Sequence, residues 1–412
     1  MSRRSSNKIF IPLRFAAALA AALPLTAAAT NGPAMSSLFA SADDAETAAS
    51  NPAGLVRLHD AEWVGGISAF YTASDFTTTA QSFGGSLTNS SSSSLAIPSL
   101  YYARPFNSDL TWGISLTVPS GLGSDPGDST PARYALEKWT LGYVSLTPAA
   151  GYRINEHFSI GAGLNLNYAL YDYQTAVFNG PGQPDGKMEL RDGNFGVGYQ
   201  LGTLYELSPM TRFALTYTSS TSSSFSSTPE LSGLTPQREA LLPVGIRSSE
   251  VSLSSEFPQH VGAGVWHEFA DGKSATLDVL WIDFSQFGLS NATLGNRSIE
   301  VNNARYNNIW AVTAGMTWPL DEKWALRLGS AYVSSGVDSQ NRSYSFRLDR
   351  IIGAGAGAQY RWSKDRVFGA NLTYYNLGDA PVSTAIPLVG TISGSFSSNY
   401  AIQLDLTMRF IR

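Results

Sequence analysis

The feature that most constrains this chain is an alternation of apolar and polar residues that runs through many of its segments. In the last segment, nearly every second residue from 400 to 410 is apolar or aromatic, and most of the residues between them are polar. The apolar set is Tyr400, Ile402, Leu404, Leu406, Met408 and Phe410, and the polar set is Gln403, Asp405, Thr407 and Arg409. Because successive side chains of a β-strand point to opposite faces, this pattern predicts a strand with one apolar and one polar face.

Residues 157–171 and 109–118 repeat the pattern. Alternation over about ten residues is typical of a transmembrane β-strand, which has one face in lipid and the other in a polar lumen. A soluble β-sandwich is the alternative, but its strands usually have only about 5–6 residues. We therefore expect an all-β fold, a transmembrane antiparallel β-barrel.

Short and long polar segments alternate between the predicted strands. The short segments, interpreted as periplasmic turns, are 106–109, 154–157, 207–210, 271–273, 320–322 and 363–366. The long segments, interpreted as external loops, are 77–94 (with the serine tract 90–94), 120–137, 174–192, 221–256, 288–306, 336–345 and 378–396. Six turns and seven loops join about fourteen strands and place both chain ends on the periplasmic side. Such a barrel encloses more space than its own side chains fill, so something must fill or gate its lumen.

The composition agrees with this fold and excludes several functions. Charged residues make up only 14% of the chain, whereas soluble proteins usually carry about 25%. The net charge of −5 argues against a nucleic-acid partner, because phosphate binding requires a basic face. The chain has no cysteine, which excludes disulfides, thiolate catalysis and cysteine-bound metal centres.

The N-terminal residues have the features of an export signal. Basic residues at Arg3, Arg4, Lys8 and Arg14 accompany an apolar run from Phe15 to Leu25, and Ala27-Ala28-Ala29 offers a cleavage site. The alternative is a membrane anchor, but the run is too short to span about 30 Å of hydrocarbon as a helix. Residues 1–29 are therefore expected to be a signal peptide. The rest of the chain is expected in the outer membrane of a Gram-negative cell, which it crosses many times.

The segment between this signal and the first strand differs from the rest. Residues 41–55 read SADDAETAASNPAGL, which is acidic at Asp43 and Asp44 and stops in Asn51-Pro52-Ala53. It is neither a long apolar run nor an alternating strand. Proline fixes φ and lacks an N–H donor, and asparagine can cap a helix or form a turn. We therefore expect a rigid corner at Asn51-Pro52-Ala53.

Five blocks in order along the chain resemble the FadL family of outer-membrane transporters. One is the stretch 41–55, in which an acidic pair precedes Asn-Pro-Ala, and the others are 146–166, 195–220, 257–287 and 323–337. This family takes up long-chain fatty acids and, in some branches, aromatic hydrocarbons. The chain departs from the family at its end, where Ile411 and Arg412 follow Phe410, because members commonly finish on an aromatic residue.

The resemblance implies that the segment before the barrel folds inside it as a hatch. We therefore expect residues 30–60 to form a hatch that includes Asp43, Asp44, Asn51, Pro52 and Ala53, and residues 61–412 to form the barrel. The residues agree with this, because Ala, Ser, Thr and Gly dominate positions 40–54 and are small enough for a lumen. The alternative is an exposed periplasmic tail that begins a helix.

The resemblance also implies a kink in the third strand that opens the wall sideways, so that an apolar substrate leaves into the membrane. The candidates in this sequence are Gly113, Pro119 and Gly121, since proline removes a ladder donor and glycine bends a strand. Pro119 is equally compatible with an ordinary strand end.

The alternation places six charged residues on the inner face of the predicted barrel. They are Arg153, Arg327, Arg361, Arg409, Asp278 and Asp405. An inward arginine could receive the carboxylate of a substrate. The alternative, which we favour, is a network of ion pairs that holds the hatch to the barrel.

Nothing in the sequence predicts catalysis or a bound metal. His260 and His267 lie seven positions apart on one predicted strand, so they face opposite sides and cannot share a metal ion. No histidine accompanies a convincing G-x-S-x-G nucleophile motif, and residues 353–357 lack the spacing of a dinucleotide-binding loop. We expect no enzyme activity, no metal and no cofactor.

Together these features predict passive uptake of hydrophobic small molecules, with capture by external loops, hatch movement and lateral exit through the wall. The expected partners are the ligand, outer-membrane lipid and lipopolysaccharide, and the barrel-assembly machinery during biogenesis. We expect a monomer that binds no nucleic acid. The alternatives are a general diffusion porin for polar solutes, an aromatic-hydrocarbon transporter of the same family, a barrel enzyme acting on lipids and a surface adhesin.

Overall fold

The computed structural model describes most of the chain from residue 32 onward. The described residues are 32–81, 88–129, 133–134, 136–242, 247, 249–294, 297–299, 306–344, 346–386 and 390–412. The predicted signal peptide, residues 1–29, lies outside them, and so do the first two residues of the predicted hatch.

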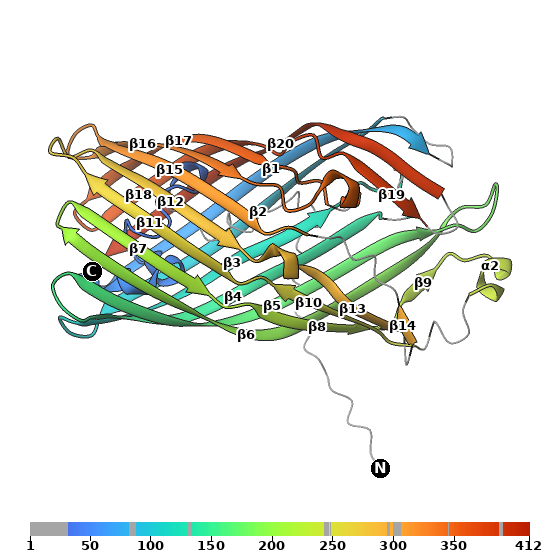
Figure 1. Cartoon of the computed structure of the whole chain (residues 1–412), viewed down its shortest axis with the longest axis horizontal. Helices are drawn as coiled ribbons and strands as arrows, with labels where there is room; N and C mark the ends of the chain where they lie inside the picture. The colour runs from blue at the N-terminus through green and yellow to red at the C-terminus, as the bar shows by residue number, and fades with distance from the viewer. Residues whose placement is uncertain are drawn as a thin grey trace, which may run out of the picture.

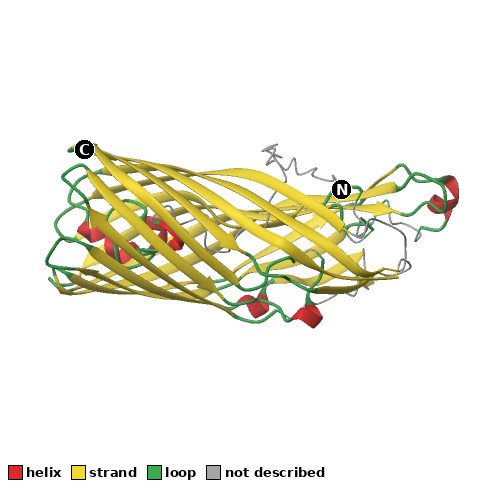
Figure 2. Ribbon diagram, turned by 90° about the horizontal axis from the view of Figure 1, so that it is seen from above, coloured by secondary structure: helices red, strands yellow, loops and turns green. Residues whose placement is uncertain are grey.

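Fourteen antiparallel strands form a closed barrel (Figures 1 and 2). The barrel closes because its first strand pairs with its last, from Glu62 opposite Ile411 to Gln81 opposite Ile392. Closure removes the unpaired edges that an open sheet would carry into lipid. The strands are β1 Glu62–Gln81, β2 Thr88–Pro105, β3 Leu110–Ser124, β4 Lys138–Arg153, β5 Phe158–Val177, β6 Gly186–Ser208, β7 Thr211–Thr218, β11 His260–Glu268, β12 Ser274–Ile282, β15 Ile309–Pro319, β16 Trp324–Val333, β17 Ile351–Ser363, β18 Arg366–Asn376 and β20 Gly390–Ile411.

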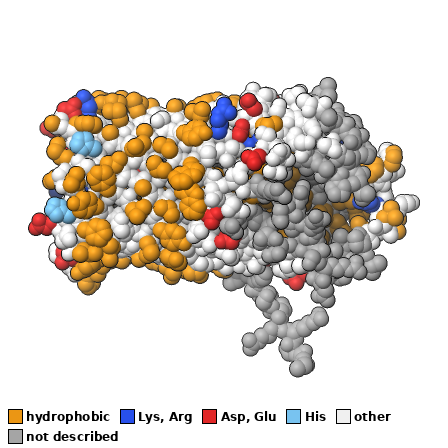
Figure 3. Space-filling view, in the orientation of Figure 1, with side chains coloured by type: hydrophobic (Ala, Val, Ile, Leu, Met, Phe, Trp, Pro, Cys, Tyr) orange, Lys and Arg blue, Asp and Glu red, His pale blue; other side chains and the backbone are white. Residues whose placement is uncertain are grey.

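The side chains of these strands alternate as the sequence predicts. On β3, Trp112 and Leu116 are exposed on the outer face, and Ser115 is buried on the inner face. On β20, Leu404 is exposed and Asp405 is buried in the same way. Figure 3 shows many apolar side chains on the outer wall, gathered in the part of the barrel toward the short turns. The prediction of a transmembrane all-β barrel is confirmed, because this outer face suits lipid and the inner face is polar.

All six predicted turns join neighbouring strands at the end of the barrel where the C-terminus lies (Figure 1). Asn and Asp side chains fix three of these turns. The Oδ1 atom of Asn107 accepts hydrogen bonds from the backbone N–H groups of Asp109 (2.9 Å) and Leu110 (2.8 Å). Asn155 and Asp321 each accept a similar pair in their own turns. These turns are set by local bonding, which explains why the sequence predicts them well.

The external loops are shorter than predicted, because the strands run well past the apolar part of the wall. The prediction that residues 77–94 form a loop is wrong: β1 continues to Gln81 and β2 begins at Thr88. The serine tract 90–94 is therefore strand, and it pairs residue by residue with positions 71–75 of β1. A run of identical residues has no alternation, so the sequence alone could not reveal this strand.

The longest predicted loops, 221–256 and 288–306, contain a second sheet of four strands. These are β8 Thr221–Ser227, β10 Val251–Phe257, β13 Gly288–Leu294 and β14 Arg297–Ile299. The rings of Phe225 and Tyr171 lie 5.4 Å apart, and those of Phe257 and Tyr143 lie 5.2 Å apart. Because Tyr143 and Tyr171 are buried on the inner face of the wall, this sheet lies inside the external part of the lumen.

The remaining elements are short. The strand β9 Glu230–Ser232 pairs with β6, and β19 Val382–Ile386 pairs with β20. The helices are η1 Pro33–Met35, α1 Thr47–Ser50, η2 Pro52–Arg57, α2 Pro236–Ala240, η3 Phe284–Gln286 and η4 Ser339–Asn341. None of the helices in the described part of the chain is long and apolar enough to cross a membrane.

Candidate functional site

Residues 32–60, here called the inner segment, lie inside the barrel near the end with the short turns (Figure 2). The backbone N–H of Ala34 donates to Thr373 Oγ1 on β18 (2.9 Å). The Nε2 atom of Gln200 on β6 donates to the carbonyl oxygen of Ala48 (2.7 Å). Since β6 and β18 are on opposite sides of the ring of strands, the inner segment crosses the lumen and is bonded to both walls.

The corner Asn51-Pro52-Ala53 lies in a notch made by three glycines on neighbouring strands. Gly151 on β4 is opposite Gly161 on β5, which is opposite Gly202 on β6. A Cβ atom added at Gly161 would overlap the backbone of the corner, and one at Gly151 would overlap the Pro52 carbonyl oxygen. Two backbones can approach this closely only where a side chain is absent.

The side chain of Asn51 holds this corner in place and is fully buried. Its Nδ2 atom donates to the carbonyl oxygens of Phe39 (3.0 Å) and Thr203 (3.2 Å). Its Oδ1 atom accepts from the backbone N–H of Ala53 (3.2 Å), so the side chain caps η2. Pro52 occupies the first turn of that helix, where no N–H donor is required.

A second row of glycines receives the start of the inner segment. Gly315 on β15, Gly329 on β16 and Gly355 on β17 lie side by side in the sheet. A Cβ atom at Gly329 would overlap the carbonyl group of Pro33, and one at Gly355 would lie 2.9 Å from Pro33 Cβ. Each glycine row therefore seats one proline-led turn of the inner segment.

Asp278 on β12, a predicted inward charge, binds the inner segment directly. It is buried, and its carboxylate accepts hydrogen bonds from the backbone N–H groups of Leu38 (3.1 Å) and Phe39 (3.4 Å). Charged acceptors make stronger hydrogen bonds than neutral ones. Asp278 is therefore an anchor for the inner segment.

Arg212 on β7 is a second anchor, and the sequence analysis missed it. Its guanidinium donates to the carbonyl oxygens of Ala40 (3.1 Å) and Ser41 (2.6 Å) and pairs with Asp43 (3.3 Å). Its Cζ atom lies 3.5 Å from the centre of the Trp266 ring. The sequence does contain a signal for this residue. Phe213 and Leu215 of the same strand face outward, so alternation places Arg212 on the inner face.

The substitution Arg212→Met is expected to loosen the inner segment without opening the wall. Two carbonyl oxygens would lose their donor, and leaving a buried polar group unsatisfied costs about 1–3 kcal/mol. The measurement is the rate at which added protease cleaves the inner segment of the folded protein in detergent. Arg361→Met is the control, because Arg361 is exposed at the end of β17. Equal cleavage of the two variants would contradict the role of Arg212.

Of two further predicted inward charges, Arg153 binds the inner segment directly and Arg409 is linked to it through Glu62 of β1. Arg409 Nε is 2.6 Å from Glu62 Oε1, and that same oxygen accepts the backbone N–H of Ala45 (3.1 Å). Arg153 donates to the carbonyl oxygen of Val56 (2.6 Å). A pair that the sequence analysis missed, Arg57 with Glu206, joins the end of η2 to β6.

The other predicted charges do not bind the backbone of the inner segment in the described structure. Asp405 accepts hydrogen bonds from two wall residues, Ser68 Oγ (2.6 Å) and Gln403 Nε2 (2.7 Å). Arg327 lines a polar cavity of about 130 Å³ together with Asp43 and Asp44. That cavity lies between the inner segment and the inner faces of β11, β12 and β15–β17, with Arg409 on its border.

A second cavity, of about 90 Å³, lies on another side of the inner segment. Leu38, Phe39 and Ser50 border it from the inner segment, and Thr117 and Pro119 of β3 border it from the wall. The rest of its lining is mostly Ser, Thr and Asn side chains. This cavity therefore connects the inner segment with the third strand.

The wall beside this cavity is only partly paired. Within the described residues, β2 and β3 pair from Pro105 opposite Thr111 to Leu100 opposite Leu116, and no further. Beyond Leu116, the described residues of β3 pair only with β4, and those of β2 before Leu100 pair only with β1. The backbone ladder between β2 and β3 thus ends part-way up the wall.

A bulge in β3 begins where this ladder ends. Its register with β4 shifts between Thr117 and Ser120, so that Val118 and Pro119 oppose the single residue Val144. Gly121 follows in regular pairing with β4. Gly113 leaves the pairing undisturbed and instead faces the inner segment, where a Cβ atom would lie 3.0 Å from Ala48 Cβ. Of the three candidate kink residues, only Pro119 lies in the irregular part.

A family profile described as outer membrane protein transport protein (OMPP1/FadL/TodX) matches residues 13–409. The chain belongs to this family. The FadL resemblance seen in the sequence is thereby confirmed, and the protein is an outer-membrane transport protein of a Gram-negative cell.

Individual relatives of the FadL family agree with this assignment. The long-chain fatty acid transport protein of Escherichia coli O6:H1 is 24% identical over 307 residues, which cover 68% of this chain and 69% of that protein. A solved Pseudomonas aeruginosa FadL homologue superimposes with a TM-score of 0.80 at 17% identity, covering 92% of this chain and 96% of its own. The Pseudomonas putida toluene transporter TodX gives a TM-score of 0.67 at 16% identity, covering 94% and 98%. At these identities, the two structures establish a shared fold.

Proposed function

We propose that this chain carries hydrophobic small molecules, either long-chain fatty acids or related hydrocarbons, inward across the outer membrane. One observation supports this proposal above the others. The inner segment occupies the lumen, and next to it the hydrogen-bonded pairing between β2 and β3 ends part-way up the wall. A general diffusion porin needs an open aqueous path, whereas here both walls bind the segment that crosses the lumen. Transport is passive, and no chemical step is part of it.

Ligand capture takes place at the external end, where aromatic side chains gather inside the barrel. The ring of Phe76 on β1 lies 4.9 Å from that of Tyr344 and 4.9 Å from that of Phe396 on β20. These rings pack with Leu136 and Val382 in one buried cluster, here called the aromatic cluster. An apolar ligand leaves water for such surfaces with a gain of about 25 cal/mol per Å² of apolar area.

The ligand then leaves sideways between β2 and β3, beyond Leu116. This exit leads from the cavity at Thr117 and Pro119, inside the wall, to the bilayer core outside it. An apolar molecule favours the bilayer over the polar layer outside the cell. The inner segment acts as a hatch that moves by a small amount, since Phe39 and Ser50 border the same cavity.

We also propose that the protein works as a monomer in outer-membrane lipid and lipopolysaccharide after insertion by the barrel-assembly machinery. The ring of strands is closed by the pairing of β1 with β20 in one chain, so closure needs no second copy. The relatives suggest two ligand classes, because one is named for long-chain fatty acids and another for toluene.

Uptake by whole cells tests this proposal. Labelled oleate and toluene are offered to cells that lack such a transporter, with and without this chain. Faster oleate entry that falls when Asn51 and Pro52 are both changed to alanine supports a fatty-acid transporter with a working hatch, and toluene entry alone supports the hydrocarbon branch. His59→Ala is the control, an exposed position in the same segment. Entry of small sugars alone would overturn the proposal in favour of a porin.

A further inference from the structure

The cavity of about 90 Å³ beside the third strand is polar, although it lies on the path proposed for a hydrophobic ligand. Its wall side carries hydroxyl and amide groups from Thr117 of β3, Ser145 and Thr147 of β4, and Asn165 and Asn167 of β5. Among the described residues, no Asp, Glu, Lys or Arg side chain lines it. The cavity therefore offers many hydrogen-bonding groups and neither an acidic nor a strongly basic one.

These polar side chains form a connected row on the inner face of the wall, here called the polar row. Thr147 Oγ1 donates to Asn165 Oδ1 (3.1 Å) and lies 3.1 Å from Ser145 Oγ. Asn167 Nδ2 donates to Thr221 Oγ1 (2.9 Å), at the start of β8. The polar row thus runs from the cavity at the third strand to the inner sheet in the external part of the lumen.

The polar row keeps unused hydrogen-bonding capacity. Ser115 precedes Thr117 on the inner face of β3, and its Oγ atom is buried without a partner. Within the described residues, the amide nitrogen of Asn165 and the hydroxyl of Thr117 make no hydrogen bond either, and both side chains border the cavity. Buried polar groups without partners are costly, so a passing molecule that bonds to them is stabilised.

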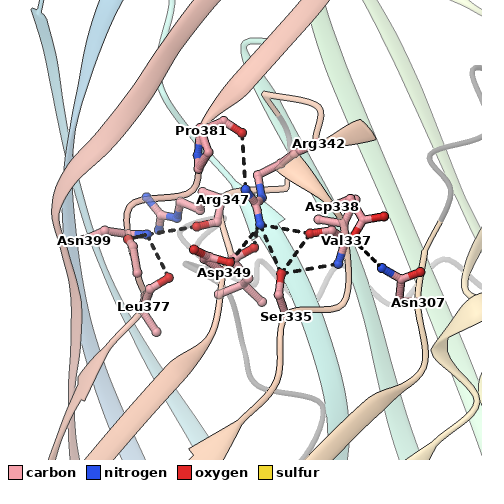
Figure 4. A network of polar contacts seen from close by, with 12 residues as sticks. Asn307, Ser335, Val337, Asp338, Arg342, Arg347, Asp349, Leu377, Pro381 and Asn399 are labelled. Atoms are coloured by element: carbon pink, nitrogen blue, oxygen red, sulfur yellow. Dashed lines mark hydrogen bonds and ion pairs between the residues drawn. The ribbon is translucent and has the colours of Figure 1, made fainter. Parts of the chain in front are cut away.

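The opposite side of the external lumen differs, because its polar groups are used to hold a connection in shape (Figure 4). In the connection between β16 and β17, residues 334–350, Arg342 is buried and forms an ion pair with Asp349 (3.1 Å). It also donates to the carbonyl oxygen of Val337 (3.1 Å). Arg347, also buried, donates to two hydroxyl groups of β1. The buried charges of this connection therefore lie across the lumen from the polar row.

The composition of the polar row favours one kind of head group over two others. A carboxylate in this cavity would leave water without meeting a cation, and burial of an unpaired charge is costly. A pure hydrocarbon would leave the hydroxyl and amide groups unbonded. A neutral head group with hydroxyls avoids both costs, because it exchanges its hydrogen bonds to water for hydrogen bonds to the polar row. Sites that bond a hydroxyl group discriminate strongly against an analogue that lacks it.

We propose that the preferred ligand is an apolar chain with a neutral, hydroxyl-bearing head group, of the class of monoacylglycerols. The head group passes along the polar row, and the apolar chain leaves through the gap between β2 and β3. This inference rests on the proposed function, because it uses the same exit, and it names a ligand class beyond fatty acids and hydrocarbons. Thr117 is then a residue that distinguishes a hydroxylated head group from a bare chain.

Entry of three labelled molecules into cells that lack such a transporter tests this inference. They are the glycerol ether of oleyl alcohol, which esterases do not cleave, oleate, and octadecene, which has no head group. With this chain present, we expect the ether to enter fastest. Thr117→Val keeps the shape of the side chain without its hydroxyl, and should lower ether entry about fivefold while octadecene enters at least as fast as before. Thr117→Ser keeps the hydroxyl and most of the ether entry. Thr111→Val, at an inward threonine of the same strand away from the cavity, is the matched control and changes neither.

The outcomes separate this inference from the proposed function. Ether entry no faster than oleate entry overturns the inference, and so does an equal effect of Thr117→Val on the ether and on octadecene. Entry of oleate or toluene in those cases leaves the transporter proposal standing. If none of these molecules enters faster than in cells without the chain, the transporter proposal fails as well. The shift in migration of the unheated protein on a denaturing gel shows that each variant is folded.

Discussion

Replacing Gly161 with valine is expected to unseat the inner segment while the barrel remains folded. The new Cβ atom would overlap the backbone at Pro52 and Ala53, and backbone atoms cannot move aside as a flexible side chain can. Overpacking costs about 1–3 kcal/mol even where neighbours adjust. At the upper end of that range, the population with an unseated inner segment rises about a hundredfold.

Permeability to small polar solutes measures this change, because an unseated inner segment leaves the polar lumen open. We expect conductance across planar bilayers, and entry of small sugars into cells, to rise strongly in the Gly161→Val protein. Gly142→Val on β4 is the matched control, since a Cβ atom at Gly142 would have no atom of the described residues within 4 Å. Unchanged conductance in Gly161→Val, with a folded barrel, would show that the glycine row does not seat the segment.

The barrel and its turns were predictable from the sequence because each depends on local information. Lipid on one side of the wall and a polar lumen on the other impose an alternation that any single strand displays, as residues 400–410 do. The turns at Asn107, Asn155 and Asp321 are held by one side chain each, so a few residues suffice to indicate them. The serine tract 90–94 has neither the alternation of a strand nor a side chain that holds a turn, and it was wrongly predicted to be part of a loop.

The two glycine rows could be predicted only in part from the sequence. Gly151 and Gly161 lie on either side of the predicted turn 154–157, so counting along that hairpin brings them face to face. The pairing of Gly161 with Gly202 crosses an external connection, whose length no sequence pattern defines. The register across that connection decides whether three small residues become one notch.

The charged residues likewise divide into those that the sequence predicts and those that it does not. Asp278 lies in the middle of β12 and Arg409 follows a long alternating run in β20, so the alternation predicts both. Asp278 binds the inner segment, and Arg409 pairs with its partner Glu62. Arg212 is the second residue of β7, where its inward phase is harder to recognise beside a turn. Arg347 lies in a connection without any periodicity, so its burial depends wholly on tertiary packing.

Deleting Pro119 is expected to abolish uptake of the hydrophobic ligand. The bulge gives β3 one residue more than β4 between Thr117 and Ser120. Removing that extra residue restores one-to-one pairing with β4 and keeps the later residues of β3 on their present faces. A straight β3 can extend its ladder with β2 beyond Leu116, which closes the place where the wall is now unpaired.

Uptake by this deletion variant should fall to the level of cells without the chain, although the variant inserts and binds ligand as the parent does. That combination is the informative one, because a closed wall blocks exit and leaves capture at the aromatic cluster untouched. Deleting Gly182, an exposed residue in the connection 178–185, is the control for the loss of one residue outside any ladder. Uptake at the parent rate after deletion of Pro119 would exclude the gap between β2 and β3 as the exit. The ligand would then have to pass the inner segment and leave at the end of the barrel with the short turns.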